Sequence, residues 1–68
     1  MIKLTHRQIE VLVEMSKGLS NKQIARRLKC VESTIKIHAR TIYTKLDVNN
    51  RTKAAVWWNT NKNEYENH

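Results

Sequence analysis

The chain has 68 residues and a mass of 8.1 kDa, which is the size of one small domain. A core this small leaves no room for a deep active-site cavity. The 13 Lys and Arg residues outnumber the 6 Asp and Glu residues, so the net charge is +7 and a polyanionic partner, most often nucleic acid, is favoured.

The composition favours short helices over strands. The sequence has no Pro, no Phe and one Gly, and it lacks the β-rich runs of a sandwich or barrel. Its longest apolar run, residues 54–58, is too short to span a bilayer, and we expect no signal peptide. The lone Cys30 excludes an internal disulfide framework and the multi-cysteine zinc patterns. We therefore expect an all-α, cytoplasmic protein.

The first predicted helix begins at Thr5. This hydroxyl lies three residues before Gln8, which is the spacing of a capping box that satisfies exposed amides at a helix start. Ile9 and Leu12 follow at helical spacing, and Gly18 suits the left-handed conformation that closes a helix.

The same capping pattern recurs at Ser20 and Gln23, and it predicts a second helix of about two turns. A turn at residues 29–31 separates it from a third predicted helix over residues 32–47. At about 100° per residue, this third helix has one apolar and one polar face. Its predicted buried stripe comprises Ile35, Ala39, Ile42 and Leu46, with His38 at the edge. The opposite face carries Ser33, Lys36, Ile37, Arg40 and Thr44.

A fourth predicted helix spans residues 51–58 and is capped by Asn50. Neighbouring residues of a helix point about 100° apart, so we expect Trp58 in the core and Trp57 at the domain edge or against a partner. Residues 59–68 contain four Asn and no aliphatic residue, and we expect a polar, disordered tail behind a domain of residues 1–58.

The second and third helices form a helix-turn-helix pattern, whose longer helix enters the DNA major groove. On its polar face, Lys36 and Arg40 can reach phosphate or guanine, and Ile37 can touch a thymine methyl. Taken singly, these residues are better explained as ordinary surface. Between positions 17 and 53, however, the sequence has ten Lys and Arg residues and only two acidic residues. This excess of positive charge favours the interpretation that the three side chains contact bases. The candidate DNA-backbone contacts are Ser20, Asn21, Lys22, Ser33, Thr34 and Lys45, with Arg26, Arg27 and Arg51 as weaker ones.

Ordered blocks of residues carry a resemblance to a known family. They are Leu4-Thr5-x-Arg7, Gly18-Leu19-Ser20-Asn21-Lys22-x-Ile24-Ala25-x-x-Leu28, Glu32-Ser33-Thr34-Ile35-Lys36-x-His38 and Lys45-Leu46-x-Val48-x-x-Arg51-x-x-Ala54. Over residues 4–58 the sequence resembles the LuxR/FixJ-type (GerE-type) helix-turn-helix domain, and in particular its NarL branch.

This resemblance implies a compact four-helix domain that binds double-stranded DNA as a dimer and regulates transcription in bacteria. Lys36, Ile37 and Arg40 would face bases, and the fourth helix would join the protomers through Ala54, Val56 and Trp57. RNA polymerase or another LuxR-type protein would be further partners. The domain usually follows a control domain, and both a stand-alone regulator and an excised domain stay open.

The sequence departs from the family pattern at three positions. Gln8 replaces the usual Glu, and Asp47 replaces a common Gly but tolerates the left-handed conformation. Val31 stands where a capping Ser or Thr is expected, which is a loss of about 1 kcal/mol.

Neither a catalytic set nor a metal site is expected. The three His residues are scattered, Asp47 is the single Asp, and there is no Gly-rich phosphate loop, so we expect no enzyme activity, metal or cofactor. A rival function is a small interaction protein whose fourth helix captures and inhibits a full-length LuxR-type regulator. Binding to an anionic membrane surface is the weakest alternative, because the cations do not line one long amphipathic helix.

Overall fold

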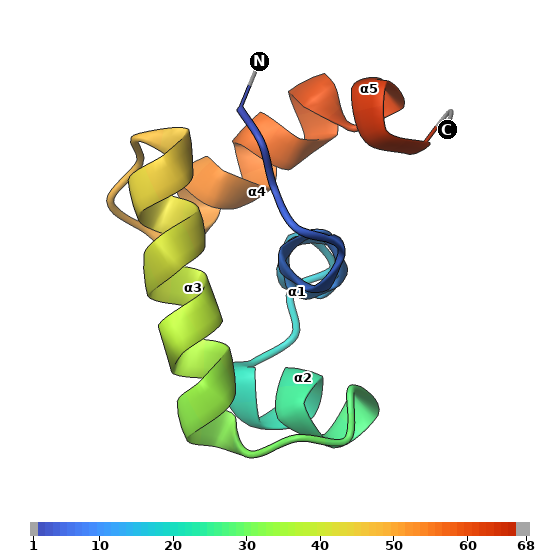
Figure 1. Cartoon of the computed structure of the whole chain (residues 1–68), viewed down its shortest axis with the longest axis vertical. Coiled ribbons are helices and arrows are strands. Elements are labelled where there is room, and N and C mark those ends of the chain that lie inside the picture. Colours follow the sequence, from blue (N-terminus) through green and yellow to red (C-terminus); the bar gives the residue numbers. More distant parts are fainter. Residues whose placement is uncertain (1, 67–68) are drawn as a thin grey trace.

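The computed structural model describes residues 2–66, and every regular element in that range is a helix. The elements are α1 (His6–Ser16), α2 (Asn21–Arg27), α3 (Glu32–Leu46), α4 (Arg51–Asn61) and the single turn α5 (Asn63–Glu66). The predicted all-α fold is confirmed. In Figure 1, α1 is seen end-on near the centre, with α2 below it, α3 to its left and α4 above it.

Two capping boxes start α1 and α2, as predicted. At α1, the Gln8 backbone N–H donates to Thr5 Oγ1 at 3.1 Å, and the Thr5 N–H donates to Gln8 Oε1 at 3.0 Å. At α2, Ser20 and Gln23 make the same reciprocal pair at 3.2 and 2.8 Å. Each box satisfies two amides that a helix start would otherwise leave without partners.

The residues at the two ends of α3 also behave as predicted from the sequence. Its N-cap is Val31, whose side chain makes no capping hydrogen bond. Its C-cap is Asp47, which adopts the left-handed conformation with φ of 56°. The tolerance expected of an Asp at this position is therefore confirmed, and the helix ends without a glycine.

The core forms around α1, which packs against α2, α3 and α4. The buried apolar side chains are Leu4, Val11, Leu12, Met15, Ile24, Ala25, Ile35, Ala39, Ile42, Leu46, Ala54 and Trp58. The predicted buried stripe of α3 and the inward position of Trp58 are both confirmed. Burial of one such large side chain is worth about 1.5–3 kcal/mol, so this set supplies the main stabilisation of the domain.

The C-terminal segment differs from the expected disordered tail. α4 continues to Asn61, and Tyr65 of α5 folds back so that its hydroxyl donates a hydrogen bond to the Ile2 carbonyl at 2.6 Å. Burial, with a smaller contribution from Glu64, raises the pKa of the Tyr65 phenol above its ordinary value of 10.0, so the phenol keeps its proton. Residues 67–68 of the expected tail lie outside the described residues.

Within residues 2–66, no helix combines the length and apolar character needed to cross a membrane.

The uncapped start of α3 gives a stability prediction. Val31 is 63% exposed, so Val31→Ser sacrifices little packing and adds the missing oxygen acceptor. We expect the free energy of unfolding to rise by about 1 kcal/mol and the melting temperature by roughly 4–8 °C, measured by thermal denaturation. The matched control is Val56→Ser, which makes the same exchange at a similarly exposed position inside α4 and gives no stabilisation. Equal melting temperatures for Val31→Ser and the wild type would contradict the interpretation that α3 lacks a stabilising N-cap.

Candidate nucleic-acid interface

The outward face of α3 presents the three side chains that the sequence singled out as base contacts. Ile35 and Ile42 are fully buried on the inner side, which turns Lys36 and Arg40 outward to solvent. Ile37 lies between these cations and is 62% exposed. Lys36 Nζ is 3.9 Å from the exposed carboxylate of Glu32, a contact that water screens and a phosphate can replace.

A groove of about 370 Å³ runs beside this face, between the start of α2 and α3. It is lined by Asn21, Lys36, Ala39, Arg40 and Tyr43. Tyr43 was missed at the sequence level, although it lies two helical turns after Lys36 and therefore on the same face. The groove brings an amide, a phenol and two cations together, which are side chains suited to phosphate and base edges.

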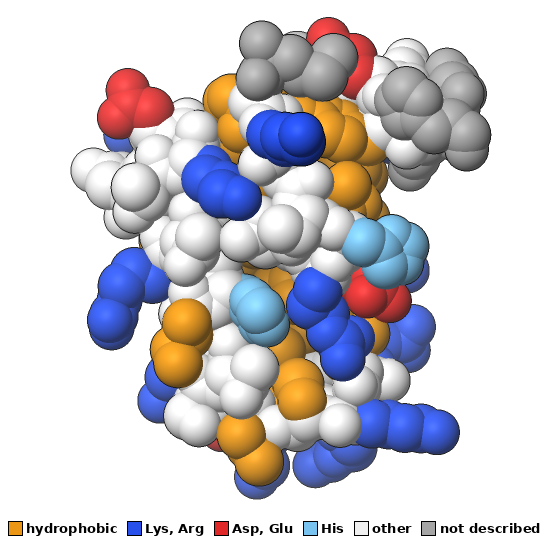
Figure 2. Space-filling view, viewed as in Figure 1, with side chains coloured by type: hydrophobic (Ala, Val, Ile, Leu, Met, Phe, Trp, Pro, Cys, Tyr) orange, Lys and Arg blue, Asp and Glu red, His pale blue; other side chains and the backbone are white. Residues whose placement is uncertain are grey.

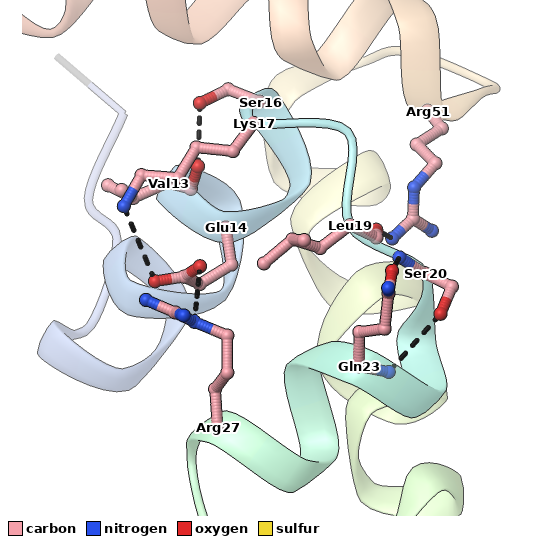
Figure 3. Close-up of polar contacts among 9 residues, drawn as sticks. All are labelled: Val13, Glu14, Ser16, Lys17, Leu19, Ser20, Gln23, Arg27 and Arg51. Atoms are coloured by element: carbon pink, nitrogen blue, oxygen red, sulfur yellow. Dashed lines mark hydrogen bonds and ion pairs between the residues drawn. The ribbon is translucent and has the colours of Figure 1, made fainter.

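The start of α2 is held in place by α4. Arg51 donates from Nη1 to Asn21 Oδ1 at 2.9 Å and from Nη2 to the Leu19 carbonyl at 2.6 Å. Figure 3 shows the Arg51 guanidinium reaching this loop beside the capping pair Ser20 and Gln23. Arg51 is therefore a structural residue here, while the neighbouring Lys22 stays exposed.

A second polar contact holds α2 against α1. Glu14 is buried, and its Oε2 lies 3.0 Å from Arg27 Nε, an ion pair whose alignment does not make a hydrogen bond (Figure 3). Lys17 Nζ approaches the other carboxylate oxygen at 3.6 Å. An unpaired buried carboxylate is costly, so Arg27 has a structural role as the partner of Glu14, although its side chain stays 58% exposed.

Lys45, predicted from the sequence as a phosphate contact, makes two hydrogen bonds within the domain. Its Nζ donates to Gln8 Oε1 at 2.8 Å and to the Lys3 carbonyl at 3.0 Å, so it joins α3 to the segment before α1. The Gln that replaces the usual Glu thus accepts from both Lys45 and the Thr5 backbone. Of the remaining predicted backbone contacts, Lys22, Ser20 and Ser33 are exposed, and Asn21 and Thr34 are half-buried.

The cations gather around these elements. Figure 2 shows Lys and Arg side chains over the lower half of the face on view, where Figure 1 places α2 and the first half of α3. Acidic side chains are sparse there. Within the described chain, no group of three His, Cys, Asp or Glu side chains forms a candidate metal site.

The predicted dimer residues of α4 do not all reach the surface. Val56 is 60% exposed and Trp57 is half-buried, but Ala54 is fully buried in the core and has no surface for a partner. This burial corrects the prediction that Ala54 contacts the partner in a dimer. Beside Val56 and Trp57 lies a groove of about 420 Å³. Its lining residues are Val48, Thr52, Lys53, Val56, Trp57, Thr60 and Asn61.

A short helix, a tight turn and a longer helix with a cationic outer face define a helix-turn-helix DNA-binding domain. Residues 3–58 match the model of the family described as bacterial regulatory proteins, luxR family. The chain therefore belongs to the luxR family, whose helix-turn-helix domain binds DNA in transcriptional regulators.

Individual relatives agree with this assignment. The chain is 47% identical over 57 residues to the transcriptional regulatory protein LnrK of Bacillus subtilis (84% of this chain, 26% of that protein). It is 47% identical over 53 residues to the nitrate/nitrite response regulator protein NarP of Escherichia coli (78% and 25%). It is 44% identical over 54 residues to NarL of the same species (79% and 25%). The chain thus spans about a quarter of the length of these relatives.

The contact between α4 and the start of α2 gives a second stability prediction. Arg51→Ala removes two hydrogen bonds to a charged donor, and we expect the free energy of unfolding to fall by about 1.5–3 kcal/mol in urea denaturation. Lys53→Ala is the control, because this exposed cation lies on the same helix and its loss changes stability by about 0.5 kcal/mol or less. If both variants lose the same small amount, Arg51 does not hold α2.

Proposed function

We propose that the chain is a sequence-specific, non-enzymatic transcriptional regulator that acts in the bacterial cytoplasm by inserting α3 into the major groove of an operator. The observation that carries the proposal is Ile37, an exposed aliphatic side chain flanked by two cations on the outward face of α3. Lys36 and Arg40 alone would bind any polyanion. An apolar side chain between them gains free energy only where it meets an apolar group, such as a thymine methyl.

The dimensions of the outward face fit this task. α3 has 15 residues and is about 22 Å long, and the major groove, about 12 Å wide, admits a helix. Lys36 and Arg40 lie one turn apart, so both can contact the same stretch of base edges. Lys22 and Asn21 at the start of α2 then lie toward the flanking phosphates, with Ser33 and Thr34 at the start of α3.

The proposal includes a dimer formed through α4. Exposed Val56 and half-buried Trp57 supply an apolar surface on α4. Figure 1 shows α4 and α2 at opposite ends of the molecule, so a partner on α4 leaves the proposed DNA face open. A two-fold dimer places two α3 helices on half-sites about one turn of DNA apart. RNA polymerase and other LuxR-type proteins are further partners under this proposal.

Substitutions separate base reading from backbone binding. Ile37→Ala is expected to weaken binding to the preferred sequence by about 1–3 kcal/mol and to change binding to random DNA much less. Lys22→Ala is expected to weaken binding to all sequences alike and to lower the slope of log affinity against log salt by about 1. Fluorescence anisotropy with specific and scrambled duplexes measures both. A loss for Ile37→Ala that is the same on scrambled DNA would remove the base-reading role.

Selection from random duplexes at about 150 mM salt tests the proposed function as a whole, because purely electrostatic binding is already weak there. We expect an inverted-repeat motif from the wild type and none from Lys36→Ala combined with Ile37→Ala. Selection without any motif would contradict operator binding. It would favour the rival function, capture of a full-length LuxR-type regulator through α4, for which co-purification that Trp57→Ala abolishes is the readout.

A further inference from the structure

The C-terminal turn α5 lies outside residues 3–58 that match the family, yet it packs against the exposed end of α4. The ring of Tyr65 lies 6.0 Å from the ring of Trp57 and 5.8 Å from that of Trp58, measured between centroids. The interplanar angles are 54° and 39°, which are tilted arrangements of the kind that attracts aromatic pairs. One tyrosine ring therefore contacts two neighbouring indoles.

Tyr65 is itself held from the other side. Its hydroxyl donates to the Ile2 carbonyl at 2.6 Å, and the Ile2 side chain packs at the edge of the core. The α4–α5 junction is continuous, since the Lys62 N–H donates to the Trp58 carbonyl at 2.8 Å and the Tyr65 N–H to the Lys62 carbonyl at 2.9 Å. The ring has little freedom to leave the indoles without breaking this set of contacts.

Trp57 has a second neighbour, the groove of about 420 Å³ on the outer side of α4. Lys53 is the charged side chain among the seven that line it. A second copy of a chain with a net charge of +7 is repelled from a cationic face, and this nearly uncharged groove is where two copies can approach. Aromatic side chains such as Trp57 are frequent anchors of such contacts.

We propose that α5 is a positioning element for self-association, in which Tyr65 holds the indole of Trp57 as one wall of the groove that receives α4 of a second copy. This inference rests on the proposed dimer. Under this inference, α5, which lies outside the residues that match the family, helps to set the affinity between two copies. Trp57 would be the contacting residue, and Tyr65 would act through it.

Sedimentation equilibrium of the full chain tests the inference. Tyr65→Ala is expected to raise the dimer dissociation constant about tenfold or more, whereas Tyr65→Phe keeps the ring, loses the hydroxyl and raises it about threefold. Asn63→Ala is the matched control, an uncharged exposed residue of the same turn, and we expect no change. Circular dichroism and affinity for a single half-site, which does not need a dimer, show that each variant is folded.

A double-mutant cycle separates positioning from a general loosening of the fold. If Tyr65 acts through Trp57, adding Tyr65→Ala to Trp57→Ala raises the dissociation constant less than about twofold further. The inference would be overturned if Tyr65→Ala raised the dissociation constant tenfold in the Trp57→Ala variant as well, or if it had no effect in the wild type. The proposed dimer itself would not be contradicted by either result. A wild-type chain that stays monomeric at all concentrations would instead overturn the proposed dimer together with the inference.

Discussion

The orientation of α3 about its own axis is the constraint on which the proposed DNA-binding face depends. Ile35 and Ile42 are fully buried against the rest of the core, and this burial leaves one side of the helix for solvent. A shift of one residue would turn Lys36 toward the core, and burying an unpaired ammonium costs an amount comparable with the whole stability of a small domain. The core therefore sets which side chains of α3 face solvent, and these include Lys36, Ile37 and Arg40.

The second constraint is polar and concerns α2. Arg27 pairs with buried Glu14 of α1, and Arg51 of α4 binds the loop that precedes α2, so basic side chains fix the helix that accompanies α3. Lys45 similarly joins α3 to the segment before α1. At least three of the 13 Lys and Arg side chains are thus engaged in contacts within the domain. The salt dependence of DNA binding should reflect the smaller outward set.

Local patterns in the sequence predicted much of the fold, because caps and helical periodicity depend on residues three or four apart. Ser20 with Gln23, the stripe through Ile35 and the left-handed Asp47 all belong to this class. The sequence did not predict the roles of Lys45 and Arg51, whose partners lie 30 to 42 residues away. Tyr65, 63 residues from Ile2, could not be found from a tail whose composition is otherwise polar.

The most direct test of the account is an NMR measurement of contacts between Ile methyl groups and DNA in the complex with the selected operator. We expect nuclear Overhauser effects from the Ile37 methyls to thymine methyl or other major-groove base protons, and none from Ile35 or Ile42, which are buried in the protein. Contacts of Ile37 with sugar protons alone, or an Ile37 resonance that DNA leaves unchanged, would contradict the account.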